Sequence, residues 1–228
     1  MFFRGAPNPR DLPLCIAIPH VERPQNYLLK TVRSLVNSDP LDGTQIAVCD
    51  FSARPSANMT EVAREFAPFI DAGQLTLARC SGGQPPLDGL VRNFGDDEAR
   101  VRWRSKQAFD AAYLMQQYSG LAPYYVHLED DMVASHGCLS AVRRIIQAAP
   151  PNWFSIKLSP LGACAIAFQS AGLEQLAAYL RLMYYEMPVD WLIDEHIDFK
   201  KRTGHPSLVK KGLFEHIGVS SSLAGQRR

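Results

Sequence analysis

Three consecutive acidic residues, Glu129, Asp130 and Asp131, follow the apolar stretch YYVHL at residues 124–128. Adjacent carboxylates repel one another, and a site that holds three of them commonly contains a cation. Carboxylate oxygens suit Mg²⁺ and Mn²⁺, which often bridge them to the phosphates of a substrate. The alternative is a solvated acidic turn or the first turn of a helix, where the helix dipole favours carboxylates. The triplet therefore predicts either a metal-held diphosphate or an acidic turn.

A second candidate group is basic. Arg100, Arg102, Arg104 and Lys106 lie within the short stretch RVRWRSK. Cations close to a helix start can bind an anionic ligand together with the free backbone N–H groups of that start. A solvated basic face of the helix is the alternative, and it requires no ligand.

The stretch PVDWLIDEHIDF (residues 188–199) offers a proton acceptor. Pro188 followed by Asp190 is typical of a helix start, and Asp190 and Asp194 are one helical turn apart on one face. A carboxylate in such a position can act as a general base, a role that contributes roughly 10²–10⁴ in rate. Capping of the helix by Asp190 is the alternative interpretation.

His216 lies between apolar neighbours in the stretch LFEHIG (residues 213–218). No HxH or HExxH pattern accompanies it, so the sequence around it does not define a metal site. His216 is therefore either a metal ligand supplied from the end of the chain or an ordinary core or surface residue.

The elements that must position these residues alternate between strands and helices. Apolar runs closed by Pro, Gly or polar residues predict strands, and apolar residues at helical spacing predict helices. The predicted strands are residues 13–19, 45–51, 74–80, 124–128, 152–159 and 163–168, and the predicted helices are 26–36, 58–69, 101–118, 173–185 and 189–201. The alternation predicts an α/β fold with a mostly parallel central sheet. The acidic triplet then lies at the carboxyl end of a strand, where ligands bind in such sheets.

Composition excludes several classes of function. The chain has 228 residues, which suits one domain, and its net charge of +1 argues against nucleic-acid binding. No apolar run approaches the roughly 20 residues of a membrane span, and the N-terminal residues lack the apolar core of a signal peptide. The five cysteines have no CxxC spacing, so we expect free buried thiols and a cytoplasmic protein.

Several ordered stretches carry a family resemblance: IAIPHVERPQNYLLKTVRSL, RVRWRSKQAFDAAYLMQQ, YYVHLEDDMV, PVDWLIDEHI and LFEHIGVSSSLAG. Together they resemble the catalytic domain of the N-acetylglucosaminyltransferase IV family, across nearly the whole chain. The resemblance implies a GT-A glycosyltransferase fold in a single Rossmann-like domain spanning residues 1–228. It also implies an inverting transfer of N-acetylglucosamine from UDP-GlcNAc in β1,4 linkage, with a divalent cation, Mn²⁺ or Mg²⁺, at a DxD-type motif.

The resemblance also implies roles for individual residues. Asp131 and His216 would bind the metal ion, and Asp190 would be the base, with Asp194 one turn deeper orienting its neighbours. The residues expected around the nucleotide sugar are Pro19, His20, Arg23 and Asp50 at the uridine, Arg104 and Lys106 near the donor, and Glu129 and Asp130 at the ribose or sugar.

Animal members of that family carry a membrane anchor, a stem and a carbohydrate-binding module that are not seen in this sequence. We therefore expect the acceptor to be a glycan or glycoside, with a bacterial-type glycan or a lipid-linked sugar among the candidates. A nucleotidyltransferase would need a glycine-rich loop after the first strand, and IPHVERP is not one. The remaining rival is a non-catalytic nucleotide- or glycan-binding domain that retains the fold.

Overall fold

A central seven-stranded sheet organises the molecule, which is described here from a computed structural model for residues 14–90, 92–210 and 212–219. Its order is β3-β2-β1-β4-β7-β6-β8, and four of its pairings are parallel while β7 runs antiparallel to β4 and β6. The strands are β1 (Leu14–His20), β2 (Thr44–Asp50), β3 (Leu75–Arg79), β4 (Tyr124–Leu128), β6 (Ser155–Lys157), β7 (Ala165–Gln169) and β8 (Ser207–Val209).

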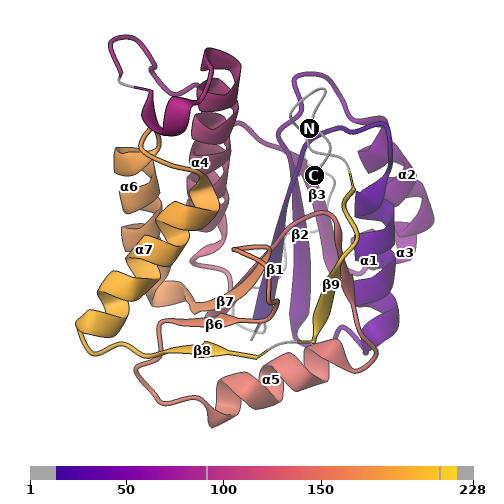
Figure 1. Cartoon of the computed structure of the whole chain (residues 1–228). Coiled ribbons are helices and arrows are strands. Elements are labelled where there is room, and N and C mark those ends of the chain that lie inside the picture. The colour runs from indigo at the N-terminus through magenta and orange to yellow at the C-terminus, as the bar shows by residue number, and fades with distance from the viewer. Residues whose placement is uncertain (1–13, 91, 211, 220–228) are drawn as a thin grey trace.

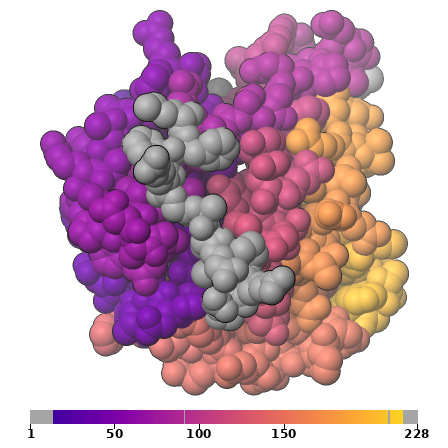
Figure 2. All heavy atoms as spheres, turned by 180° about the vertical axis from the view of Figure 1, so that it is seen from behind, coloured from indigo at the N-terminus to yellow at the C-terminus, as the bar shows by residue number. Residues whose placement is uncertain are grey.

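Helices cover both faces of the sheet. The helices that connect the N-terminal strands cover one face, and helices from later in the chain cover the opposite face. α5 lies along one end of the molecule (Figures 1 and 2). The helices are α1 (Tyr27–Ser38), α2 (Ala57–Glu65), α3 (Ala67–Asp71), η2 (Asn93–Gly95), α4 (Glu98–Tyr118), α5 (Cys138–Ala148), η3 (Ser170–Gly172), α6 (Leu173–Met183) and α7 (Val189–Arg202). None of the helices in these described ranges is long and apolar enough to cross a bilayer.

The alternation of side chains along β1 separates two hydrophobic cores. Leu14, Ile16 and Ile18 pack in the core that includes α1, α2 and α5. Ala17 faces the other core, which contains α4, α6 and α7. Successive strand residues point to opposite faces, and a small residue on the second face lets α4 approach the sheet closely. The sheet therefore fixes α4 and α7 on the same side of the molecule.

A separate two-stranded sheet was not predicted. β5 (Met132–Ala134) pairs antiparallel with β9 (Phe214–His216), and the register places His216 opposite Met132. α5 and β8 were not predicted either, and the helix expected at 58–69 is interrupted at Phe66 between α2 and α3. Strands of three residues are too short to show the alternation from which a strand is recognised.

We expected five free thiols, and this expectation is wrong for Cys49 and Cys80. Cys49 and Cys80 form a disulfide with a Cα–Cα distance of 5.5 Å, while Cys15, Cys138 and Cys164 are free and buried. β2 and β3 are neighbours, and Cys80 directly follows the end of β3, so the two thiols meet across adjacent strands. The cysteines therefore no longer favour a reducing compartment.

Candidate active site

The turn that follows β4 directs the three acids of the triplet to different places. Glu129 directly follows β4 and lines the same pocket as His127, whereas the carboxylate of Asp130 points toward the end of β1. The carboxylate of Asp130 contacts His20 Nδ1 at 2.5 Å and also pairs with Arg23. Thr31 of α1 donates to the backbone carbonyl of Asp130 at 2.8 Å. Asp130 therefore connects the end of β4 to the end of β1.

Asp131 and Glu129 meet His216 at the small sheet. His216 Nε2 lies 3.4 Å from Asp131 Oδ2, and Ile217 N donates to the Asp131 carbonyl at 2.9 Å. One ligand atom from each of Glu129, Asp131 and His216 lies within 4.8 Å of the others. The pairing of β5 with β9 thus brings His216 next to Glu129 and Asp131.

Arg23 provides a cation beside the acids. Its guanidinium lies 3.1 Å from Asp131 Oδ2, pairs with Asp130 and stacks over the ring of Tyr27 at 4.8 Å. Burial disfavours the charged form of Arg23, but the carboxylates of Asp130 and Asp131 outweigh that effect and raise its pKa. Arg23 consequently stays charged and neutralises part of the acidic cluster.

The residues of this cluster fit a hard divalent cation. Two carboxylates and one imidazole are suitable ligands for Mn²⁺ or Mg²⁺. Beside them, Gly218 leaves room that any side chain would fill, since a Cβ there would lie 2.1 Å from Asp131 Oδ2 and 3.1 Å from His216 Cε1. The space next to the Asp131 carboxylate therefore exists because residue 218 has no side chain.

Gly218→Ala is expected to weaken Mn²⁺ binding about tenfold or more, because the added methyl group displaces the carboxylate of Asp131. Calorimetric titration with MnCl₂ measures the effect. Gly120→Ala is the matched control, since a Cβ at Gly120 meets nothing within 4 Å. Equal Mn²⁺ affinity in both variants would show that Gly218 does not shape a metal site.

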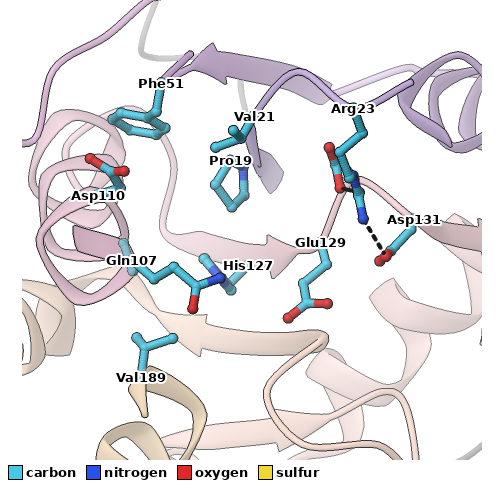
Figure 3. Close-up of a pocket in the computed structure, with 12 residues that line it drawn as sticks. Pro19, Val21, Arg23, Phe51, Gln107, Asp110, His127, Glu129, Asp131 and Val189 are labelled. Atoms are coloured by element: carbon cyan, nitrogen blue, oxygen red, sulfur yellow. Dashed lines mark hydrogen bonds and ion pairs between the residues drawn. The ribbon is translucent and has the colours of Figure 1, made fainter. Parts of the chain in front are cut away.

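A pocket opens next to the cluster, between the ends of β1 and β4 and the helices α4 and α7. Figure 3 shows Glu129 and Asp131 on one side of it and Phe51 and Asp110 on the other. The lining residues are Pro19, Val21, Arg23, Phe51, Gln107, Asp110, Ala111, His127, Glu129, Asp130, Asp131 and Val189. The pocket thus has acids and a cation at one end and a more apolar wall elsewhere, an arrangement suited to a polar ligand with an anionic part.

Asp110 is a second acidic group in this pocket. It is buried, pairs with Lys106 and accepts a hydrogen bond from the backbone N–H of Gly82. A Cβ at Gly82 would lie 2.5 Å from Asp110 Oδ1, so the loop after β3 approaches α4 closely at this point. Burial raises the pKa of Asp110 to about 6, although Lys106 and Gly82 oppose the rise.

The raised pKa of Asp110 predicts a pH-dependent stability. Its stabilising contribution is complete below its ordinary pKa of 3.8 and is lost as pH rises through about 6. The two pKa values differ by about 2, which corresponds to about 3 kcal/mol. Asp110→Asn should therefore gain free energy of unfolding relative to the wild type between pH 4 and pH 7. Urea unfolding at several pH values measures this, with the exposed Asp71→Asn as control; parallel profiles for wild type and Asp110→Asn would contradict it.

Four residues expected around the donor do not line the pocket, and one of them, His20, is buried and contacts Asp130. Arg104 is fully buried, lies 3.1 Å from Asp96 Oδ2, and has its pKa lowered by burial. Lys106 contacts the pocket residues Asp110 and Phe51 without lining the pocket itself. Asp50 is buried at the end of β2 and accepts from Ser52 N at 3.0 Å. Arg102, by contrast, is exposed and pairs with Glu98, as a surface cation would.

The two candidate bases are in different surroundings. Asp190 lies in the first turn of α7, next to Val189, and a Cβ at Gly162 would lie 3.4 Å from its Oδ2. The residue before α7 is Pro188, whose side chain makes no cap hydrogen bond, and Asp190 is the acidic residue of the first turn. Asp194 forms an ion pair of 2.6 Å with Lys157 of β6. Asp190 therefore starts the helix next to the pocket, whereas Asp194 connects α7 to the sheet.

The sequence reasoning missed several residues of the site. Gln107, Asp110 and Ala111 share one face of α4 at helical spacing, and Asp110 is an acid inside the apolar run QAFDAAYL. His127 lies two residues before Glu129 on the same face of β4, and burial lowers its pKa to about 4, so it is neutral. These periodicities were visible in the sequence. For Gly218, the sequence carries no signal beyond the glycine itself.

A family model and the curated relatives that match this chain indicate the same family. The model of the MGAT4 conserved region matches residues 3–228. The chain is 33% identical over 235 residues to alpha-1,3-mannosyl-glycoprotein 4-beta-N-acetylglucosaminyltransferase C of Mus musculus, covering 98% of this chain and 48% of that protein. It is also 33% identical over 230 residues to alpha-1,6-mannosyl-glycoprotein 4-beta-N-acetylglucosaminyltransferase of Gallus gallus, covering 97% and 49%. The chain thus spans about half the length of these relatives.

Solved structures show the same fold at low sequence identity. The mannosyltransferase PcManGT from Pyrobaculum calidifontis, in complex with GDP-Man and Mn²⁺, aligns with a TM-score of 0.56 at 14% identity over 92% of this chain and 58% of that one. The galactosyltransferase LgtC, in complex with donor and acceptor sugar analogues, aligns with a TM-score of 0.52 at 10% identity over 80% and 70%. The predicted GT-A glycosyltransferase fold with a mostly parallel sheet is confirmed.

Proposed function

We infer a glycosyltransferase activity for this chain, which belongs to the MGAT4 family. The single observation that carries the inference is the cluster of Glu129, Asp131 and His216 at the rim of a pocket that α7 borders at Val189. Both relatives described above are named as N-acetylglucosaminyltransferases. We therefore propose that the donor is UDP-GlcNAc and that the transfer inverts the anomeric configuration.

The proposed chemistry divides between the two sides of the pocket. Asp131 and His216, with Glu129 beside them, would hold a divalent cation, Mn²⁺ or Mg²⁺, which would supply positive charge at the diphosphate of the donor. Arg23 adds a fixed cation at the same place, and Asp130 holds Arg23 and His20 in position. Preorganised charges of this kind stabilise the leaving group where negative charge develops.

Asp190 is the proposed base on the opposite side. Its carboxylate removes the proton of the acceptor hydroxyl, while the hydroxyl oxygen attacks the anomeric carbon from the face opposite the leaving diphosphate. The new glycosidic bond forms as the bond to UDP breaks, so the configuration inverts. Asp194 acts on this step only by its ion pair with Lys157, which fixes α7 against the sheet.

The acceptor is proposed from the relatives' names. Both are described as acting on a mannosyl-glycoprotein. A mannose hydroxyl in a glycan or glycoside, glycosylated in β1,4 linkage, is therefore the first acceptor to test for this chain. The chain spans about half the length of each relative, so the relatives' acceptor is only a first candidate for it. Bacterial-type glycans and lipid-linked sugars are therefore included in the same test.

Metal-dependent UDP release across a panel of UDP-sugars tests the proposal. We expect UDP release from UDP-GlcNAc to exceed that from UDP-glucose and UDP-galactose, to rise when a mannoside is added, and to stop in EDTA. A non-catalytic nucleotide- or glycan-binding domain is the second candidate. It would bind UDP or a glycan with no turnover under any of these conditions, and that result would overturn the proposed activity.

A further inference from the structure

An exposed pair of aromatic rings lies next to the proposed base. Phe94 and Trp191 pack edge to face with ring centroids 5.4 Å apart, yet 61% of Phe94 and 50% of Trp191 remain exposed. An edge-to-face contact covers little of the two rings, so the pair presents open aromatic surface to the solvent. Large exposed apolar groups that are held in place commonly mark a binding surface.

The loop that carries Phe94 is held in one conformation. Asn93 donates to the Glu186 carboxylate at 2.7 Å and to the Glu186 carbonyl at 3.1 Å. Asp96 pairs with Arg100 at 2.8 Å and with Arg104 at 3.1 Å. Between these anchors Phe94 has a φ of +63°, a conformation that is unfavourable for a bulky side chain. Strain of this kind is found most often at functional sites. Phe94 is therefore held outward at a cost in stability.

Trp191 is carried by α7, which lines the pocket, and Phe94 is carried by η2, which lies against the pocket-lining helix α4. Trp191 follows Asp190 in the first turn of α7, two residues after the lining residue Val189. The ring of Phe94 lies 6.0 Å from the guanidinium carbon of Arg104, and Gln107 lines the pocket one turn further along α4. In Figure 1 the loop and η2 lie above α7. The pair thus lies outside the pocket, close in the chain to Asp190 and in contact with the helix that carries Gln107.

We propose that Phe94 and Trp191 bind a sugar ring of the acceptor next to the one whose hydroxyl Asp190 deprotonates; this inference rests on the proposed function. The axial C–H groups of a pyranose form an apolar face that packs on an aromatic ring, while its hydroxyls remain in water. Trp is among the residues that contribute most at binding surfaces because it offers a large rigid area. The pair would therefore favour an oligosaccharide acceptor over a monosaccharide.

The test compares two acceptors, methyl α-mannoside and a mannose-terminated pentasaccharide. In the wild-type chain we expect a higher kcat/KM for the pentasaccharide. Trp191→Ala and Phe94→Ala should lower kcat/KM for the pentasaccharide about tenfold or more. The same two alanine variants should leave the kcat/KM for methyl α-mannoside and the KM for UDP-GlcNAc unchanged. Trp191→Phe and Phe94→Tyr retain an aromatic face and should keep most of the preference.

Phe199→Ala is the matched control, because Phe199 is a half-exposed aromatic residue further along α7. Equal losses for both acceptors in Trp191→Ala would indicate a structural effect on Asp190 and overturn the inference. Loss of a dimer in light scattering on the same substitution would show that the pair contacts a second copy of the chain, and would overturn it as well.

Failure of the proposed function is distinguishable from failure of this inference. UDP release from UDP-GlcNAc without acceptor reports on the donor site alone. If the wild-type chain releases no UDP, the pentasaccharide is titrated directly and followed by NMR, and Trp191→Ala must still weaken its binding. If UDP release is normal and the pentasaccharide preference is absent from the wild type or unchanged in Trp191→Ala, only the inference is wrong.

Discussion

Asp131→Asn is expected to abolish Mn²⁺-dependent UDP binding and to lower turnover by about a hundredfold or more. Asp131 contributes one of the three ligand atoms of the candidate metal cluster and lies 3.4 Å from His216 Nε2. Its carboxylate is also the anion that Arg23 contacts at 3.1 Å. An amide at this position binds a hard cation less well than a carboxylate and carries no charge. The loss should therefore be specific to binding that requires metal.

Calorimetry of UDP binding with MnCl₂ and with EDTA measures this effect. The fold should persist, because Arg23 keeps its ion pair with Asp130 and the substitution preserves volume. Thermal unfolding checks that point. Asp71→Asn changes the same charge at an exposed position on α3 and should leave UDP binding intact. Wild-type UDP affinity in Asp131→Asn, together with indifference to EDTA, would rule out the metal site.

Asp190→Asn is expected to reduce kcat by about a hundredfold or more while donor affinity stays close to that of the wild type. A base acts on the acceptor hydroxyl, so removing its charge leaves the interactions with UDP unchanged. Asparagine has nearly the same shape as aspartate and can accept the same hydrogen bonds, so α7 should be preserved. Product formation and calorimetric UDP affinity, measured on the same preparation, separate the two effects.

Asp194→Asn is the matched control on the same helix. It removes an ion pair with Lys157 in which the aspartate is 41% exposed, so stability should fall by no more than about 1 kcal/mol. Turnover should be largely retained. If Asp190→Asn stays active while Asp194→Asn does not, the base lies one turn further along α7. Activity in both variants would mean that this helix does not carry the base.

The sequence by itself determined the elements that repeat regularly and the chemistry at their ends. Continuous apolar runs predicted β1 to β4, and apolar residues at helical spacing predicted α4 and α7, because buried strands and helices require apolar residues in those patterns. The proline at 188 predicted the start of α7, since proline is tolerated only at the beginning of a helix. Five ordered motifs were enough to recognise the family to which the chain belongs.

Only the tertiary structure decided which of these residues meet. His216 lies beside Asp131 because β9 pairs with β5 in one register, and two three-residue strands carry no pattern that predicts a partner. The disulfide of Cys49 and Cys80 likewise depends on the adjacency of β2 and β3. Arg104 and Asp110 both lie on α4, yet packing buries one beneath the loop of Phe94 and turns the other toward the pocket. Local sequence specifies backbone period and helix ends, whereas contacts between distant residues are set by how the elements pack.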